Sequence, residues 1–308
     1  VLLAASVLWF YVKQKLNRNS ALAILLLLVL FDLVMVNKRY VNDEDFISSK
    51  KLENPFPMTE VNSAILEDPG HYRVMNFTVN PMNDGSTSFY HNSIGGYHAA
   101  KPRRYQELFD FQIAKNNLEV LNMLNTKYFI FPDENNIPRV QLNEEANGNA
   151  WFVEEVKIVA GADEEIRALD SLKTKKTAGL EKEFSKAVNS LVFSKDSTAS
   201  ILLKKYQAND MLYESNSAVD QLAVFSEVYY KNGWNAYVDG VPSLHFRANY
   251  LLRAMVIPKG KHEIRFKFEP EVIKTGTNIV LVSYALLLFI PLGWYLLDKK
   301  KGRKSDHT

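Results

Sequence analysis

The sequence predicts an α+β fold, in which a small mixed α/β subdomain and an antiparallel, jelly-roll-like β-sandwich are flanked by transmembrane α-helices. Apolar runs lie at both ends of the 308-residue chain, and short alternating segments separated by turn residues follow Asn149. The predicted divisions are two transmembrane segments with a short basic loop (1–36), the mixed subdomain (37–145), the sandwich (146–277), a transmembrane helix (278–297) and a basic tail (298–308).

The net charge of the chain, +2, averages over parts of opposite sign. Residues 1–36 carry +2, from three basic residues and one aspartate, and residues 278–308 carry +3, from five basic residues and two aspartates. This leaves −3 for residues 37–277, which therefore lack the basic face that nucleic-acid binding requires. The chain has no cysteine, which excludes a disulfide framework and a thiolate metal site.

The segment Asn278–Leu297 has the length and composition of a transmembrane helix. It carries no charge, and at about 1.5 Å per residue it spans roughly 30 Å, the thickness of the hydrocarbon core of a bilayer. Trp294 and Tyr295 lie near its end, and five basic residues follow between 299 and 304. The alternative is a buried core helix, which seldom ends in five basic residues. We therefore expect the lipid bilayer to be a partner of this chain.

The N-terminal apolar runs set the expected topology of a multi-pass cell-membrane protein. Ala21–Val36 is interrupted by Asp32, which lies one turn from the outer end, where a carboxylate reaches headgroups or water. The three basic residues between 13 and 18 form a short loop, and short basic loops stay in the cytoplasm. Residues 37–277 are therefore expected to be extracytoplasmic, with the C-terminal tail in the cytoplasm.

The chain begins inside an apolar run, Val1–Val12. Basic residues follow this run instead of preceding it, and a second apolar run comes next, so the segment does not have the order of a signal peptide. We therefore expect the chain to be the C-terminal part of a longer protein.

The patterns between the membrane and the sandwich predict a small mixed unit. Residues 37–57 are polar without a period, which is typical of a linker, and Thr59 is expected to cap a helix that ends before Pro69-Gly70. Further predicted elements are a strand at His71–Phe77, a helical stretch in two pieces at Lys101–Leu124 and a buried strand at Lys127–Phe131.

The sandwich is predicted from short strands at regular spacing with turn residues between them. A helix is expected at Asp163–Leu172. The predicted strands are Ala150–Val159, Ser200–Tyr206, Met211–Ser215, Leu222–Tyr230, Ala236–Val238, Leu251–Val256 and Glu263–Phe268.

Turn residues between these strands also allow a second interpretation. Gly233, Gly240 and Gly260 are expected to supply positive φ, and Trp234 is expected to fill the sandwich. Direct contact of this polar series, which runs from Tyr229 to His262, with a ligand is the less favoured alternative.

Residues 83–107 form the densest polar and aromatic stretch of the sequence. Two arginines follow a helix-starting proline, so they could hold a phosphate by bidentate hydrogen bonds at a helix N-terminus, and a tyrosine could stack on a sugar face. The alternative is an ordered loop whose arginines pair with carboxylates of the same domain. The candidate substrate-binding residues are Tyr97, His98, Lys101, Arg103 and Arg104.

No catalytic, metal or cofactor site is predicted within this chain. His91 and His98 are seven residues apart without a carboxylate at ligand spacing, and the glycines at 95 and 96 lack the lysine of a phosphate-binding loop. The acidic run Asp43–Asp45 lies close to the membrane and is interpreted as a solvated run, with a cation or headgroup contact as the alternative.

Several segments together resemble one family of large bacterial membrane proteins, the YfhO family. Ser226–Gly240 and Arg247–Pro270, followed by one apolar helix and a basic tail, resemble the C-terminal end of that family. Asp32–Phe46, Ser93–Leu108 and Leu121–Ile130 look similar to it as well.

The resemblance implies a glycosyltransferase-like protein of the GT-C type, which takes a sugar from a polyprenyl-phosphate carrier and modifies a cell-surface glycopolymer. The acidic residue expected as base in such enzymes lies in the first outer loop of an N-terminal helix bundle. This chain does not contain that loop, so no catalytic residue is carried over, and the chain alone is expected to be inactive. The candidate residues would then stabilise the departing phosphate or position the acceptor.

Two other functions remain open. The extracytoplasmic part is alternatively a non-catalytic carbohydrate-binding or assembly module on a membrane scaffold or transporter. A freestanding soluble enzyme conflicts with the three apolar segments. An acidic residue in the first outer loop of the N-terminal bundle would favour the enzyme over the scaffold.

Overall fold

The computed structural model describes residues 2–305, and the side chains of residues 2–296. The chain divides into two compact units, Val1–Met58 and Thr59–Thr308.

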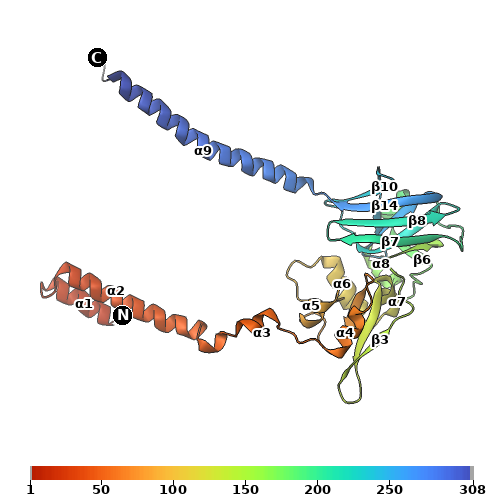
Figure 1. Cartoon of the computed structure of the whole chain (residues 1–308), viewed down its shortest axis with the longest axis horizontal. Coiled ribbons are helices and arrows are strands. Elements are labelled where there is room, and N and C mark those ends of the chain that lie inside the picture. The colour runs from red at the N-terminus through yellow and green to blue at the C-terminus, as the bar shows by residue number, and fades with distance from the viewer. Residues whose placement is uncertain (1, 306–308) are drawn as a thin grey trace. The chain divides into compact units, whose positions relative to one another are not determined.

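The first unit is a helical hairpin followed by short helical turns. Helices α1 (Leu2–Val12) and α2 (Arg18–Tyr40) pack against each other (Figure 1). The side chain of Asn17 caps α2 by accepting a hydrogen bond from the backbone amide of Ser20. Helix α2 runs four residues past the predicted end at Val36. The predicted linker is not irregular throughout, since it contains η1 (Asp43–Asp45) and α3 (Ser49–Glu53).

Among the residues that the structure describes, two helices are long and apolar enough to cross a membrane. They are Arg18–Tyr40, which is α2, and Glu271–Leu296 within α9 (Glu271–Ser305). Their side chains are almost entirely exposed, whereas the core helix of a soluble protein buries one face. Helix α9 starts at Glu271, seven residues before the predicted span, which begins at Asn278. Residues 271–277, which include charged and polar side chains, form its first two turns and extend the helix ahead of the apolar run. The predicted basic cluster at 299–304 lies outside the described side chains.

The second unit contains the remaining elements, and we call residues 59–270 the sheet region. Its helices are α4 (Glu60–Leu66), α5 (Ser86–Tyr90), α6 (Arg103–Phe111), η2 (Ile113–Lys115), α7 (Leu118–Met123), α8 (Ala162–Ala168) and η3 (Lys182–Ala187). Its strands are β1 (Arg73–Asn76), β2 (Thr126–Pro132), β3 (Pro138–Leu142), β4 (Ala150–Val153), β5 (Glu155–Val159), β6 (Thr177–Glu181), β7 (Ser200–Gln207), β8 (Asp210–Ser217), β9 (Gln221–Val228), β10 (Trp234–Val238), β11 (Val241–Ser243), β12 (Phe246–Ala248), β13 (Leu252–Ile257) and β14 (Gly260–Phe268).

The mixed α/β part is built on a three-stranded sheet in the order β1-β2-β3. Strands β1 and β2 are parallel, and helices α5 to α7 lie between them in the sequence, whereas β2 and β3 form an antiparallel hairpin. As predicted, Thr59 caps α4, since its hydroxyl accepts a hydrogen bond from the amide of Asn62. Ile65, Tyr72, Val74 and Ile130 form a small core here.

The predicted sandwich is confirmed. A five-stranded antiparallel sheet, β11-β10-β14-β8-β7, faces a four-stranded antiparallel sheet, β12-β13-β9-β4 (Figure 1). The core between them contains Tyr213, Phe225 and Phe266, whose rings pack edge to face. The α+β class with flanking apolar helices therefore agrees with the sequence prediction.

Strand β9 shows how the two parts of the sheet region are joined. Its residues are buried on both faces: Ala223 and Phe225 point into the sandwich, while Leu222 and Val224 pack on the core shared with the α/β part. A strand that is covered on both faces is expected to have consecutive apolar residues, as residues 222–225 do.

The sequence prediction differs from the structure in several strands. The predicted strand Ala150–Val159 is two strands, because the chain leaves the four-stranded sheet at Glu154, and β5 then pairs in parallel with β6. Strands β3, β6, β11 and β12 were not predicted. Strand β13 begins at Leu252, one residue later than expected, because Asn249 and Tyr250 have positive φ and cannot continue a strand.

Candidate functional site

The predicted loop between β1 and α6 folds back on itself at its two glycines. The amide of Gly96 donates a hydrogen bond of 2.5 Å to the carbonyl of Pro81. A Cβ atom on Gly95 would lie 1.8 Å from that same oxygen, so only glycine permits this approach. Asp84 holds the opposite side of the loop, since its carboxylate accepts hydrogen bonds from the hydroxyls of Ser86 and Thr87. The loop is therefore ordered by its own backbone.

Three of the predicted residues lie at the outside of this loop. Tyr97 is 81% exposed, and His98 is also exposed, with its Nδ1 accepting a hydrogen bond from the amide of Ala100. Lys101 is half-buried, and its Nζ lies 3.4 Å from the sulfur of Met82. The exposed ring of Tyr97 is free to contact a ligand.

The two predicted arginines point in different directions. The side chain of Arg103 is 90% exposed, and its Nε lies 2.7 Å from Oε1 of Glu107. The side chain of Arg104 is 28% exposed, and it enters the domain. Its Nη2 lies 2.6 Å from Oε1 of Glu181, and its Nη1 donates to the carbonyl of Tyr250 at 3.2 Å. Both arginines thus pair with carboxylates of their own domain, as the alternative interpretation expected.

Arg104 is the centre of a polar cluster that joins α6 to the sandwich. Its guanidinium lies 4.5 Å from the centre of the Tyr250 ring, and the hydroxyl of Tyr250 donates to Oε2 of Glu107 at 2.5 Å. Glu181 accepts a second cation, since Nη2 of Arg247 lies 2.9 Å from the same Oε1. The cluster therefore ties a helix of the α/β part to β6 and to the β12–β13 loop.

Glu165 on α8 is the most unusual member of this cluster. Its side chain is 1% exposed, and its Oε2 lies 3.4 Å from Nη1 of Arg104. Its Oε1 has no hydrogen-bond partner within the part of the chain that the structure describes. Burial, together with the nearby carboxylate of Glu181, raises the pKa of Glu165 to about 8. Burying a neutral carboxyl group at this position costs less free energy than burying a carboxylate would.

Glu181 behaves in the opposite way. Burial by itself would raise its pKa, but Arg104 and Arg247 outweigh burial and lower the pKa below its ordinary value. One proton is therefore held on Glu165 beside an ionised Glu181.

A second buried polar cluster, around Glu227 on β9, was not predicted. Oε1 of Glu227 lies 3.8 Å from Nη2 of Arg73 and 3.8 Å from Nε2 of His71. Arg253 completes it: it is 2% exposed, its Nε donates to the carbonyl of Val228 at 3.0 Å, and its guanidinium lies 4.0 Å from the centre of the Trp234 ring. The cluster therefore places the charged side chains of Glu227 and Arg253 inside the sheet region.

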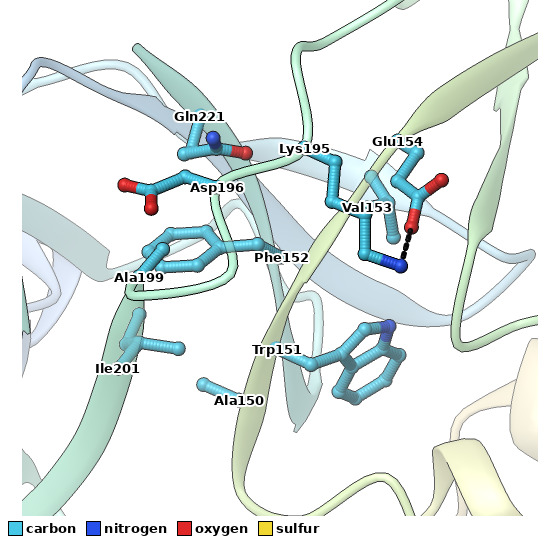
Figure 2. A pocket seen from close by; sticks show the side chains of 10 residues that line it. All are labelled: Ala150, Trp151, Phe152, Val153, Glu154, Lys195, Asp196, Ala199, Ile201 and Gln221. Carbon is cyan, nitrogen blue, oxygen red and sulfur yellow. Dashed lines mark ion pairs between the residues drawn. The ribbon is translucent and has the colours of Figure 1, made fainter. Parts of the chain in front are cut away.

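The edge of the sandwich carries a small groove (Figure 2). It has a volume of about 280 Å³ and lies between β4 and the chain segment before β7. Lys195 and Glu154 form an ion pair of 3.2 Å across it, as Figure 2 shows. Asp196 accepts hydrogen bonds from the amides of Ala218 and Thr198. The charged groups of this groove are therefore already paired.

No group of three or more metal-ligating side chains is present among residues that the structure describes. His91, one of the two histidines weighed as ligands, is buried and its Nε2 lies 3.0 Å from the side-chain oxygen of Asn62. Burial lowers the pKa of His91.

The two buried clusters could not have been found from sequence spacing. Arg104 and Glu181 are 77 residues apart, and Glu107 and Tyr250 are 143 residues apart. The substrate-binding role of the five predicted residues stays a prediction. In the structure Tyr97, His98 and Arg103 are exposed, whereas Lys101 is half-buried and Arg104 enters the domain.

No curated protein and no solved structure shows a significant match to the chain. Residues 180–280 match the model of a family described as bacterial membrane protein YfhO. This segment includes both motifs, 226–240 and 247–270, on which the sequence resemblance depends. The match confirms the resemblance: residues 180–280 are similar to the YfhO family of bacterial membrane proteins.

Proposed function

We propose that this chain is the C-terminal region of a multispanning membrane glycosyltransferase of the GT-C type. In this proposal the enzyme takes a sugar from a polyprenyl-phosphate carrier and transfers it to a cell-surface glycopolymer, and residues 37–277 are extracytoplasmic. One observation carries it: on a chain with a YfhO-family segment, β14 ends at Phe268 and an apolar helix of membrane length begins at Glu271. A folded domain tethered this closely to a membrane helix acts on molecules at the membrane surface.

The chemistry assigns the sheet region a supporting role. In an inverting transfer, an acceptor hydroxyl attacks the anomeric carbon, the bond from that carbon to the phosphate oxygen breaks, and the hydroxyl proton passes to a carboxylate base. The polyprenyl phosphate leaves with the electron pair. The base is expected in the N-terminal helix bundle of the whole protein, as the family resemblance implies.

Arg103 is the arginine suited to the leaving phosphate. Its Nε is bound to Glu107, while its two Nη groups have no partner within the described chain. Two parallel N–H groups can bind phosphate oxygens in a bidentate manner. Tyr97, His98 and Lys101 are on the same exposed loop and would contact the sugar or the acceptor. Arg104 instead positions α6, because Glu181 and the Tyr250 carbonyl occupy its donors.

The double substitution Tyr97→Ala and Arg103→Ala in the full-length protein tests this role. We expect surface glycosylation, measured in living cells by sugar analysis of the envelope, to fall by about tenfold or more, as expected for the loss of a charge-assisted hydrogen bond. Lys261→Ala is the matched control, since Lys261 is exposed on β14 and has no side-chain partner in the described chain. Glycosylation at the wild-type level in the double variant would refute the assignment.

A second function is favoured by the ion pairs of Arg103 and Arg104 with carboxylates of their own domain. In this case the sheet region is a non-catalytic carbohydrate-binding or assembly module on a membrane scaffold. Replacing the acidic residues of the first outer loop of the whole protein by their amides separates the two. Loss of transfer supports the enzyme, and unchanged glycosylation supports the scaffold.

A further inference from the structure

A large cleft lies at the end of the sandwich from which α9 departs. Its volume is about 1340 Å³, which exceeds the roughly 300–1000 Å³ of sites for drug-sized ligands. The β9–β10 turn, at residues 230–235, forms one wall, and the end of β14 with the first turn of α9, at residues 268–274, forms the other. Both walls lie within the segment 180–280 that matches the family. A cleft of this size fits a chain of several sugar rings better than a single small molecule.

The floor of the cleft is built by a close backbone approach at Gly233. Its φ is +116°, and a Cβ atom there would lie 2.8 Å from the ring of Phe268 and 2.9 Å from Pro270. The amide of Glu269 donates to the carbonyl of Gly233 at 2.6 Å and fixes the two walls together. The glycine that the sequence explains as a turn residue therefore also sets the shape of the cleft.

The polar groups of the cleft are mostly unengaged. The side-chain amides of Asn209 and Asn232 and the hydroxyl of Tyr230 have no hydrogen-bond partner within the described part of the chain, and all three side chains are exposed. An amide offers one acceptor and two donors, and a hydroxyl offers both, as each hydroxyl of a sugar does. The face of Tyr230 and the apolar side chains of Val272 and Ile273 supply surface for the carbon face of a sugar ring.

The charges of the cleft cancel. Lys231 and Lys274 are balanced by Glu269 and Glu271. Glu269 stays ionised, because a hydrogen bond of 2.8 Å from the hydroxyl of Tyr237 and a longer one from Asn235 lower its pKa. A phosphate or a cation would gain little net attraction here, whereas a neutral polyhydroxylated ligand can use all of the donors and acceptors.

We propose that this cleft binds an uncharged oligosaccharide, with Tyr230 packing on a sugar ring and Asn209, Asn232 and Glu269 bonding its hydroxyl groups. The cleft is separate from the loop that holds Tyr97 and Arg103. Its function does not depend on whether the whole protein is a transferase or a scaffold.

The test uses the whole chain in nanodiscs of zwitterionic lipid, since many detergents carry sugar headgroups that would compete. Saturation-transfer NMR is recorded with three neutral probes: maltotetraose, cellotetraose and chitotetraose. We expect at least one probe to bind, and its affinity to fall about tenfold or more in Tyr230→Ala and in Asn232→Ala. Both residues are exposed and make no side-chain hydrogen bond in the described chain, so both variants should fold. Lys261→Ala is the control, since Lys261 is exposed and does not line the cleft, and it should bind like the wild type.

Three results would overturn the proposal: no binding of any of the three probes, binding that both cleft variants retain, or displacement of the probe by inorganic pyrophosphate at equal concentration. If the wild-type chain binds none of the probes but transfer in cells is normal, the cleft is rejected as a glycan site and the proposed function stays intact. If the Tyr97 and Arg103 double variant transfers sugar at the wild-type level but the cleft variants lose glycan binding, the proposed role of the loop is rejected and the cleft stays a glycan site.

Discussion

Glu165 and Glu227 are two buried carboxyl groups of the same sheet region whose pKa values are shifted in opposite directions. Both are joined to arginines that come from the α/β part, Arg104 in one case and Arg73 in the other. The pKa of Glu165 is raised to about 8, whereas the pKa of Glu227 is lowered although burial opposes this. Burial is common to both and so cannot explain the difference.

The neighbours explain it. Glu165 has a second carboxylate, Glu181, that competes for the same arginine. The second cation, Arg247, pairs with both Glu181 and Glu183, so two cations are shared among three acids. Glu227 has His71, Arg73 and Arg253 around a single acid. The ratio of cations to carboxylates therefore sets the charge of a buried acid here. The predictions below test this difference, from the largest expected effect to the smallest.

Removing the cation at the Glu227 cluster should have the largest effect. Arg253→Ala removes one of the cations that lower the pKa of Glu227, leaves it with Arg73 and His71 at 3.8 Å, and opens a hole beside Trp234. We expect a loss of about 3–5 kcal/mol in the free energy of unfolding. Urea unfolding of the whole chain in detergent, followed by tryptophan fluorescence, measures it. A loss below about 1 kcal/mol would mean that Glu227 does not depend on Arg253.

The adjacent arginines give a matched pair at the other cluster. Arg104→Ala removes the cation shared by Glu165 and Glu181, and we expect a loss of about 2–3 kcal/mol in the free energy of unfolding. Arg103→Ala removes only an exposed pair and should change stability by no more than about 0.5 kcal/mol. The same urea experiment compares them. Equal effects of the two substitutions would contradict the assignment of Arg104 as the internal tie.

Glu165 should give the sheet region a pH dependence of known sign. Its folded pKa, about 8, lies above the ordinary value of 4.5, so the folded chain keeps a proton that the unfolded chain releases between these pH values. Stability is therefore full below about pH 4.5 and falls as the pH rises toward 8.

Glu165→Gln should remove this contribution. We expect the variant and the wild type to be similar at pH 5, and the variant to be the more stable of the two at pH 9. The difference between their unfolding midpoints in urea, recorded across this range, is the readout. A difference that does not change with pH would show that Glu165 is ionised in the folded chain.

The exposed pair of His262 and Asp239 should show the smallest effect. The Nδ1 of His262 lies 2.6 Å from Oδ2 of Asp239, and its Nε2 lies 3.1 Å from the carbonyl of Lys259. Two acceptors require a doubly protonated ring, and the Asp239 hydrogen bond raises the pKa of His262.

This raised pKa means that the stabilisation is present below about pH 6.5 and is lost as the pH rises through the folded pKa of His262. His262→Ala should therefore destabilise the chain at pH 5.5 by less than about 1 kcal/mol and have little effect at pH 8.5. NMR titration of the imidazole checks the pKa directly. An equal effect at both pH values would indicate a packing role.

The comparison also shows what the sequence could predict. Strands β7 to β10, β13 and β14 lie close to their expected positions, because alternation and the turns at Gly233 and Gly240 are local signals. Strands β6 and β12 were not predicted. Both are short, and their positions depend on a contact between residues 70 apart in the sequence, the hydrogen bond from the amide of Gly179 to Oδ1 of Asn249.

The site was harder to predict than the fold. The sequence identifies the loop and both arginines, but it cannot show that Arg104 enters the domain while Arg103 stays outside. That division depends on Glu181 and Tyr250, which come near α6 only in the folded chain. Exposure of Tyr97 follows from the backbone approach at Gly95, which no spacing rule encodes.

The central claim, that the sheet region faces the outside of the cell at the membrane surface, has one direct test. The chain contains no cysteine, so single cysteines report sidedness without background. Ser197→Cys lies in an exposed segment of the sheet region, and Gln14→Cys lies in the turn between α1 and α2. With a membrane-impermeant maleimide on intact cells, we expect labelling at position 197 at once and at position 14 only after permeabilisation. The reverse pattern would place the sheet region in the cytoplasm and contradict the account.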